Sequence, residues 1–414
     1  MAEGLNSLPN GWELKALSEV FRIKPPKSEV KNTLNTDDMV SFVPMNCLGI
    51  LQKNLEQHEQ KPLNKVLNNY TYFSEGDVLL AKITPCFENG KLGVASGLTN
   101  GVGFGSSEFI VFRSKGLIIP VYLFYYLSRE AFRIEGKTQM FGAVGHKRVS
   151  KDFVEDYLIP YPKVIAQERI VGVLDEAFEG IATATAQAEK NLQNARELFQ
   201  SVLQSTFSQK GDDWEEAALG DEVDFLAGFA FKSKGYTDDK SGIKLLRGDN
   251  IIQGRLRWED VKRWPANDVK EYLKFELKEN DVVLAMDRPW VSNGLKLSLM
   301  QSTDLPCLQV QRTARLRVNS KLHYSYLFYL ISSPPCIQYL LGSQTGIGVP
   351  HISGKQILSY CFLRPSLDEQ QTIVKKLDAL SEETKRLETI SQRKLDALAE
   401  LKQSLLQRAF TGQL

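Results

Sequence analysis

Two short motifs and the histidines hold residue types that could do chemistry, but each lacks the partners that its chemistry requires. Gly101-Val-Gly-Phe-Gly105 has enough glycine to approach a phosphate group, yet no helical pattern follows it, which favours a simple turn. Glu135-Gly-Lys137 places a carboxylate near a lysine, as some nucleases do, without a second carboxylate upstream on a strand. No pair has the H-E-x-x-H spacing of a zinc site among the four histidines, which are His58, His146, His323 and His351.

The remaining motifs also argue against catalysis by this chain. Ser333-Pro-Pro-Cys336 is similar to the S-P-P-[YF] motif of amino-methyltransferases, but it lacks the stacking aromatic residue, and its prolines explain it as a helix break. The chain has no G-x-x-x-x-G-K-[ST] phosphate loop and no G-x-S-x-G nucleophile motif. The sequence therefore predicts a non-catalytic protein without a metal or cofactor of its own. Reduced thiols in the cytoplasm, rather than disulfides, are expected for the five cysteines, which are Cys47, Cys86, Cys307, Cys336 and Cys361.

Basic side chains gather in three stretches, although the net charge of the chain is only +1. Each stretch alone fits an ordinary solvated surface, whereas three of them favour a side that faces phosphate groups. The stretches comprise Arg22, Lys24, Lys27 and Lys31; Lys137, Lys147, Arg148 and Lys151; and Arg312, Arg315, Arg317 and Lys321.

The elements that would position these residues occur twice along the chain. Gly76-Asp-Val-Leu-Leu-Ala81 returns as Asn280-Asp-Val-Val-Leu-Ala285, 204 positions later. Tyr122-Leu-Phe-Tyr125 returns as Tyr326-Leu-Phe-Tyr329 at the same offset. Such a constant offset predicts two copies of one module, which would present two similar surfaces.

Each copy begins with a mixed domain of strands and helices. The stretches Asp77 to Ile83 and Asp281 to Met286 are expected to form buried strands. A helix should begin at Pro120 and continue to about Ile134. The matching helix of the second copy, Tyr324 to Leu341, should be broken by Pro334-Pro335.

Each copy ends in a long helix with an apolar stripe. The spacing is that of a heptad seam, and each helix would be about 60 Å long. Two such stripes are expected to pack on each other as an antiparallel coiled-coil pair. The predicted seam residues are Ile170, Leu174, Ala177, Ile181, Ile373, Leu377, Leu380 and Leu387. The predicted segments are a first domain at 1–163, a first helix at 164–209, a second domain at 210–364 and a second helix at 365–414.

Taken together, these motifs resemble the conserved regions of the specificity subunit of Type I restriction–modification systems. The carriers of the resemblance are the two helix ends, Gln200 to Ser208 and Gln403 to Thr411, with the pattern Gln-Ser-[VL]-Leu-Gln-x-x-Phe-[ST]. The resemblance covers essentially the whole chain. Its other carriers are Trp12-Glu-Leu-Lys-Ala-Leu17, Trp214-Glu-Glu-Ala-Ala-Leu219, Ile159-Pro-Tyr-Pro162, Gln167-Glu-Arg-Ile-Val171 and Asp368-Glu-Gln-Gln-Thr-Ile-Val374.

The resemblance implies an α+β fold with two tandem target recognition domains, related by a pseudo-two-fold axis and separated by two long antiparallel coiled-coil helices. Each domain would read one half of a bipartite, asymmetric site in double-stranded DNA. The helices would set the gap and dock two modification subunits, which would carry S-adenosylmethionine for adenine methylation. Nuclease/translocase subunits would complete a cytoplasmic complex.

Within that family, loops at matching positions of the two copies are the expected readers of DNA. One loop follows the shared strand and the other precedes the long helix. Asparagine-glycine pairs in the first loop fit plain turns as well as base contacts, and Lys147-Arg148 fits either phosphate contact or solvated surface. The candidates are Lys82, Asn89, Lys91, Gln139, His146, Lys147 and Arg148 in the first copy, and Arg288, Asn293, Gln344, Thr345 and His351 in the second.

Two other functions stay open on the sequence alone. A protein-interaction scaffold would use two domains on a helical stalk without nucleic acid, and a test of DNA retardation would separate it from a DNA reader. A stand-alone enzyme would show methyl transfer or cleavage by this chain alone. A membrane protein is not expected, because the most apolar stretch, Gly116 to Ser128, is shorter than the roughly 20 residues that a span needs.

Overall fold

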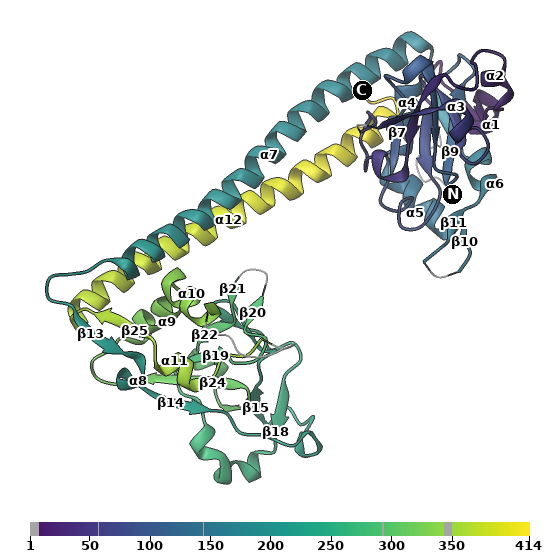
Figure 1. Ribbon diagram of the computed structural model, residues 1–414. Helices are drawn as coiled ribbons and strands as arrows, with labels where there is room; N and C mark the ends of the chain where they lie inside the picture. Colours follow the sequence, from purple (N-terminus) through teal and green to yellow (C-terminus); the bar gives the residue numbers. More distant parts are fainter. Residues whose placement is uncertain (1–7, 57, 144, 292–293, 343–349) are drawn as a thin grey trace. The chain divides into compact units, whose positions relative to one another are not determined.

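The computed structural model describes residues 8–56, 58–143, 145–291, 294–342 and 350–414. The chain divides into two compact units, one made of residues 1–188 and 393–414 and the other of residues 189–392. Each unit holds one globular domain, here called the first and second domain, and parts of both long helices (Figure 1). The predicted α+β class with two similar domains and two long helices is confirmed.

Two four-stranded sheets form the first domain. Its strands are β1 (Glu13–Ala16), β2 (Phe21–Ile23), β3 (Met39–Val43), β4 (Glu59–Pro62), β5 (Thr71–Ser74), β6 (Val78–Ala81), β7 (Leu92–Val94), β8 (Val102–Gly105), β9 (Phe109–Ser114), β10 (Met140–Phe141), β11 (Arg148–Val149) and β12 (Leu158–Tyr161). One sheet has the order β2-β9-β6-β7 and is antiparallel. The other has the order β4-β3-β8-β5 and contains one parallel pair, β3 with β8. β1 pairs with β12, which ties the start of the domain to the strand before the first long helix.

Short helices pack against both of these sheets. They are α1 (Leu17–Val20), α2 (Ser28–Lys31), α3 (Leu63–Val66), α4 (Pro120–Leu127), α5 (Glu130–Thr138) and α6 (Lys151–Asp156), with 3-10 turns η1 (Met45–Cys47) and η2 (Thr99–Gly101). α4 is the most apolar of them, and its residues from Tyr122 to Leu127 are all buried. They share one hydrophobic core with buried residues of β6 and β9 and with the beginning of the first long helix.

The second domain repeats the antiparallel sheet of the first in the order β14-β24-β19-β22. Its strands are β13 (Glu215–Ala218), β14 (Val223–Ala227), β15 (Ile243–Leu246), β16 (Ile251–Ile252), β17 (Arg255–Leu256), β18 (Lys262–Trp264), β19 (Val282–Ala285), β20 (Trp290–Val291), β21 (Gly294–Leu295), β22 (Leu297–Leu299), β23 (Cys307–Gln309), β24 (Thr313–Val318) and β25 (Cys361–Arg364). The other sheet, β18-β15-β23, has three strands instead of four. The helices are α8 (Leu219–Glu222), α9 (Tyr324–Ser332), α10 (Pro334–Gly342) and α11 (Gly354–Leu358), with 3-10 segments η3 (Ser233–Gly235), η4 (Ala266–Phe275) and η5 (Ser302–Asp304).

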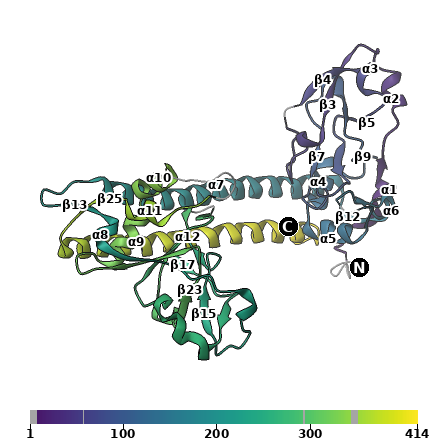
Figure 2. The ribbon, with the colours of Figure 1, turned by 60° about the horizontal axis from the view of Figure 1, so that its bottom comes forward.

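The two long helices are α7 (Val164–Ser208) and α12 (Leu367–Ala409), and they run side by side in opposite directions (Figure 2). In the first unit, Leu174 near the start of α7 shares a core with Leu406 and Phe410 at the end of α12. In the second unit the roles are exchanged, because Leu203 near the end of α7 shares a core with Leu377 near the start of α12. The end of each repeat therefore completes the core of the other repeat's domain.

Aromatic rings seal both helix ends. Phe410 lies edge-on to Tyr122 and Tyr126, with ring centroids 4.9 and 5.0 Å away. Phe207, the matching residue of the first repeat, lies edge-on to Tyr326 at 5.3 Å. The Phe in the repeated Gln-Ser-[VL]-Leu-Gln-x-x-Phe-[ST] motif thus packs on the other repeat's domain, buried at Phe410 and half-buried at Phe207.

Burial differs along the predicted seam. Ile170, Leu174 and Leu377 are buried, whereas Leu387 exposes 39% of its surface. Half-buried positions of the seam are Ala177, Ile181, Ile373 and Leu380. Small side chains supply the other buried positions, namely Ala188, Ala195, Thr384 and Ser391. Large leucines at the ends therefore anchor the helices to the domains, while small residues line the stretch between them.

The helix predicted from Pro120 to Ile134 is wrong, because the structure breaks it between α4 and α5. Arg129 has extended backbone angles there, and its guanidinium lies 3.6 Å from the ring centre of Tyr126. The predicted break at Pro334-Pro335 is confirmed, and it falls at the matching place between α9 and α10. Since the first copy has no proline at its break, the interruption belongs to the shared fold rather than to proline alone.

The glycine-rich stretch of residues 101–105 is also corrected. Its last four residues form β8, an inner strand of the second sheet, rather than a turn. A Cβ atom on Gly103 would lie 2.1 Å from the ring of Phe73, and one on Gly105 would lie 2.4 Å from the carbonyl oxygen of Val43. The glycines thus permit close packing. None of the described helices combines the length and the apolar character that a membrane crossing requires.

Candidate nucleic-acid interface

A buried ion pair fixes the strand before the first candidate loop in both domains. Asp77, at the start of β6, accepts two hydrogen bonds from Arg113 at 2.9 and 2.7 Å. Asp281, at the start of β19, accepts two from Arg317 at 2.7 and 2.7 Å. Both carboxylates are 1% exposed, so each bidentate pair locks its central strand against the neighbouring strand.

The two candidate loops of the first domain meet through main-chain hydrogen bonds. The amide of Thr84, in the loop after β6, donates to the carbonyl of Lys147 at 2.9 Å. The amide of Val149, beyond that carbonyl, donates to the carbonyl of Lys82 at 2.9 Å. We call this pairing, between the loop after the shared strand and the segment before α6, the loop junction.

The second domain has the same loop junction. The amide of Arg288 donates to the carbonyl of Pro350, and the amide of Ile352 donates to the carbonyl of Met286, both at 2.9 Å. These four residues follow their counterparts in the first domain by 203 or 204 positions. The fold therefore brings together, twice, two loops that the sequence placed about 60 residues apart.

An ion pair occupies the loop junction of the first domain. Arg148 donates to both carboxylate oxygens of Glu108, at 2.9 and 2.8 Å, and also to the carbonyl of His146 at 3.2 Å. The hydrogen bonds from Arg148 lower the pKa of the Glu108 carboxyl below its ordinary value. Lys82 donates to the carbonyl of Ser107 at 3.0 Å and lies 4.0 Å from Glu108. Arg148 is therefore neutralised and braces the loop.

A different polar cluster occupies the loop junction of the second domain. Asp287 Oδ1 lies 2.5 Å from Nδ1 of His351, and Asp287 Oδ2 lies 3.1 Å from Nε of Arg312. The histidine is 39% exposed at its side chain and the arginine 70% exposed. Both can thus face a ligand while the carboxylate holds them in place.

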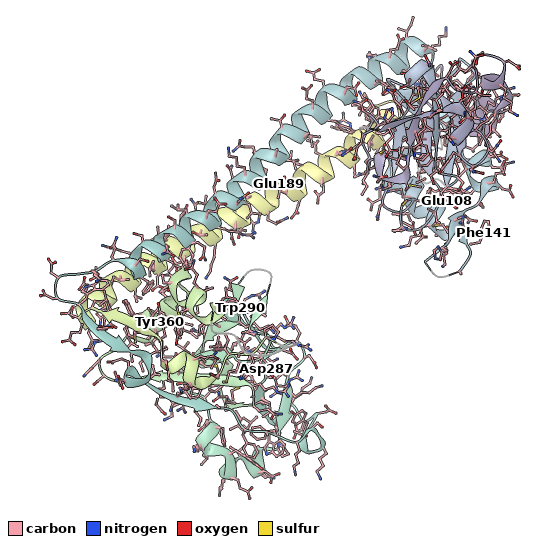
Figure 3. The ribbon with its side chains drawn as sticks, in the orientation of Figure 1. Glu108, Phe141, Glu189, Asp287, Trp290 and Tyr360 are labelled. Atoms are coloured by element: carbon pink, nitrogen blue, oxygen red, sulfur yellow. The ribbon has the colours of Figure 1, made fainter. Side chains whose placement is uncertain are left out.

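The two clusters are built on matching positions with different side chains. Glu108 and Arg312 are 204 positions apart, and Arg148 and His351 are 203 apart. The acid of the second cluster, Asp287, comes from the loop after the shared strand instead. Figure 3 labels Glu108 in the first domain and Asp287 in the second. One main-chain frame therefore presents two different sets of donors and acceptors.

A hairpin of β10 and β11 carries the exposed candidates of the first domain. Gln139, His146 and Lys147 are all exposed. Phe141, which the sequence did not single out, is 64% exposed and lies out on this hairpin (Figure 3). Gly142 has a φ of +124° and would bring a Cβ to 3.0 Å from the carbonyl of His146, so the turn requires glycine.

The other candidate DNA-binding residues either have structural roles or remain predictions. Lys91 donates its ammonium group to the carbonyl of Met45 at 2.8 Å, which holds the first loop in place. Asn89 is exposed in a turn that Gly90 closes with a φ of +80°. Arg288 is exposed and has a φ of 45°. The remaining candidates lie outside the described residues: Asn293, Gln344 and Thr345.

Sequence reasoning missed Glu108 and Asp287 and did not see the role of Arg312. Glu108 precedes β9, 40 residues before its partner Arg148, so no local pattern links the two. Extending the 204-residue offset beyond the conspicuous motifs would have aligned Glu108 with Arg312.

The described residues contain no group of three or more His, Cys, Asp or Glu side chains that could hold a metal ion. Cys86, Cys307, Cys336 and Cys361 are free thiols. Burial raises the pKa of Cys307 and of Cys336, so both thiols stay protonated at neutral pH.

One protein family matches most of this chain. Residues 9–194 and 211–395 each match the family model described as Type I restriction modification DNA specificity domain. The Type I restriction enzyme EcoAI specificity subunit of Escherichia coli is 29% identical over 475 residues, covering 92% of this chain and 80% of that protein. The MjaVIII specificity subunit of Methanocaldococcus jannaschii is 24% identical over 421 residues, covering 98% and 94%.

Solved structures agree on the fold. A chain from a study of complex assembly and conformational transition of the type I R-M system has a TM-score of 0.80 at 18% identity, covering 99% of this chain and 100% of that one. The HsdS subunit from Thermoanaerobacter tengcongensis has a TM-score of 0.63 at 19% identity, with 100% of both chains covered.

Proposed function

This chain belongs to the family of Type I restriction–modification DNA specificity domains, and on that premise we propose that its two domains read the two halves of one bipartite DNA target. Its role is that of a DNA specificity subunit, as in the relatives from Escherichia coli and Methanocaldococcus jannaschii. The observation that supports two half-sites is the loop junction, because its frame occurs once in each domain.

The contents of the two loop junctions favour an asymmetric target. Arginine and histidine side chains donate to base acceptors such as guanine O6 and N7, whereas carboxylates accept from cytosine N4. The second domain offers Arg312 and His351, both held by Asp287. The first domain offers the hairpin residues Gln139 and Lys147 beside its neutralised ion pair. Different side chains on one frame should read different bases.

We also propose the remaining parts of the complex. The long helices would set the gap between the half-sites and dock two modification subunits, which would bind S-adenosylmethionine and methylate adenine. Nuclease/translocase subunits would supply cleavage, so that this chain would contribute recognition and no catalysis. The net charge of +1 supports a division of labour in which partner subunits supply many phosphate contacts. The complex would act on chromosomal DNA in the cytoplasm.

The test is selection of bound duplexes from a random pool by the chain assembled with its modification subunits. We expect two short conserved blocks of different sequence, separated by a gap of fixed length. His351→Ala with Arg312→Ala should relax one block and leave the other unchanged. A single contiguous block, or relaxation of both blocks, would contradict one half-site per domain, and a complex that retains no duplex would favour a scaffold.

A further inference from the structure

A cleft in the first domain collects four lysines from three separate segments of the chain. Its volume is about 580 Å³, and it is lined by Lys24 and Lys27 after β2, by Lys82 after β6, and by Lys151 at the start of α6. We call it the lysine cleft. No Asp or Glu is among the described residues that line it, and the acids near its lysines, Glu108 at 4.0 Å from Lys82 and Glu155 at 3.0 Å from Lys151, lie outside the lining.

The walls of the lysine cleft are mostly apolar. Pro25, Tyr70 and Ile110 are among the residues that line it. Low-polarity walls concentrate the field of nearby charges, because water screens them less than it does on an open surface. The lysine cleft therefore suits a single anionic group attached to a larger, less polar body.

Two of the lysines are held by the protein and two remain adaptable. Lys27 donates to the carbonyls of Leu67 and Asn68 at 2.6 and 3.1 Å, and Lys82 is held at the carbonyl of Ser107. Burial lowers the pKa of Lys27, and the positive charges of Lys24 and Lys31 lower it further. The charged form of Lys27 is thus disfavoured when no anion is present.

Lys24 and Lys151 are the adaptable pair. Lys24 is exposed, and its φ of 59° is fixed by a hydrogen bond from its amide to the carbonyl of Val111 at 2.9 Å. Lys151 is 74% exposed at its side chain and pairs with Glu155, one helical turn away, at 3.0 Å. An exposed pair of this kind is weak, so Lys151 can exchange its partner for a ligand at little cost.

The lysine cleft borders the loop junction. Lys82 and Val149 take part in the junction and also line the cleft, and Lys151 follows two residues later. In protein–DNA complexes, contacts to phosphate groups fix the register of the protein, while neighbouring side chains read base edges. A phosphate held in the cleft would therefore fix the position of the exposed residues of the β10–β11 hairpin relative to the base edges.

We propose that the lysine cleft binds a backbone phosphate of the DNA strand that the first domain reads, and so sets its register. This inference rests on the proposed function and assigns a contact within it. At the positions 204 residues after Lys24 and Lys27, the second domain has Gly228 and Phe231, and Phe231 packs against Tyr272 at 4.9 Å. The anchor is accordingly a property of one half-site.

The experiment measures the salt dependence of DNA binding by the chain assembled with its modification subunits. The double variant Lys24→Ala and Lys151→Ala should lower the slope of log K against log salt by about 1 to 2, since one lysine on a phosphate accounts for about 1. Lys24→Arg with Lys151→Arg should keep the slope. The matched control, Lys65→Ala with Lys163→Ala, removes two exposed lysines of the same domain that do not line the cleft, and it should also keep the slope.

Two further arms identify the source of the phosphate. A single methylphosphonate at the contacted position of the first half-site should weaken the wild type about tenfold, and it should cause no further loss in the double alanine variant. Deoxynucleoside monophosphate at millimolar concentration should not displace DNA. Tight binding of the monophosphate that depends on Lys24 and Lys151 would instead assign a free-nucleotide site and overturn the proposal.

The outcomes separate this inference from the function on which it rests. If the wild type selects a bipartite site and the double alanine variant keeps its salt slope, the lysine cleft is not an anchor while the proposed function stands. If the wild type retains no DNA, both are wrong. An equal loss of slope in the control variant would show general surface attraction rather than a built contact.

Discussion

Phe410 lies at the end of α12 but belongs to the core of the first domain, so shortening it should loosen that domain in particular. Its side chain is 2% exposed and contacts the rings of Tyr122 and Tyr126 on α4 at 4.9 and 5.0 Å. Replacing a fully buried phenylalanine with alanine costs about 3–5 kcal/mol, because apolar contacts are lost and a cavity remains. Phe410→Ala should therefore lower the local stability of the first domain by about that amount.

Hydrogen exchange followed by mass spectrometry measures this loss element by element. A loss of 3 kcal/mol or more corresponds to roughly a hundredfold faster exchange or more, since about 1.4 kcal/mol is a factor of ten. The acceleration should appear in the amides of α4, while α9 of the second domain keeps its protection. The matched variant Phe207→Ala should instead accelerate exchange in α9 of the second domain. The acceleration should be smaller, because Phe207 is only half-buried.

The reasoning would be refuted by either of two results. Unchanged protection of α4 in Phe410→Ala would mean that the helix end does not support the first domain. Equal acceleration in α4 and α9 would mean that the two domains open together, so that each core does not depend on its own helix end.

Three other perturbations have definite expected outcomes. Asp281→Ala leaves Arg317 without its bidentate partner and should lower the free energy of unfolding by about 3 kcal/mol in urea titrations, whereas Asp260→Ala, which removes a 78% exposed carboxylate, should change it by less than about 1 kcal/mol. Arg148 lowers the pKa of Glu108, so their pair stabilises the fold above the ordinary glutamate pKa of about 4.3 and loses that contribution as pH falls through the lowered value. Arg148→Ala should thus destabilise the chain at pH 7, and this loss should shrink as the pH falls below about 4.3. A loss that stays constant as the pH falls would contradict this. One extra heptad in each long helix adds about 10 Å, so duplexes selected by the assembled complex should show a gap longer by about three base pairs of 3.4 Å.

The repeated frame could be predicted from the sequence because its signals are local and occur twice. The buried runs Val78–Ala81 and Val282–Ala285 are both strands, as expected. The long proline-free stretches form α7 and α12. The heptad steps also include Thr384, which is buried, whereas Leu387 is 39% exposed, so periodicity predicts the stripe but not how closely it is covered at each position.

The contents of the site could not be predicted in the same way. The pair of Glu108 and Arg148 depends on two loops that meet only after the sheet has formed. Lys91 carries the charge expected of a DNA contact, yet its ammonium group donates a hydrogen bond to the main-chain carbonyl of Met45. Neither contact produces a repeating pattern in the sequence, because each joins two segments that lie far apart along the chain.

The loop junction is held by main-chain amides and carbonyls, and this has a consequence for how such proteins diversify. Substituting the side chain at 108, 148, 312 or 351 changes what the surface offers, while the four amide–carbonyl bonds that shape it remain. Substitution of Arg312 or His351 therefore leaves that frame in place, whereas substitution of Glu108 or Arg148 also removes an ion pair that braces it. A lineage can retarget one domain at a time, through few substitutions, without rebuilding the scaffold that displays them.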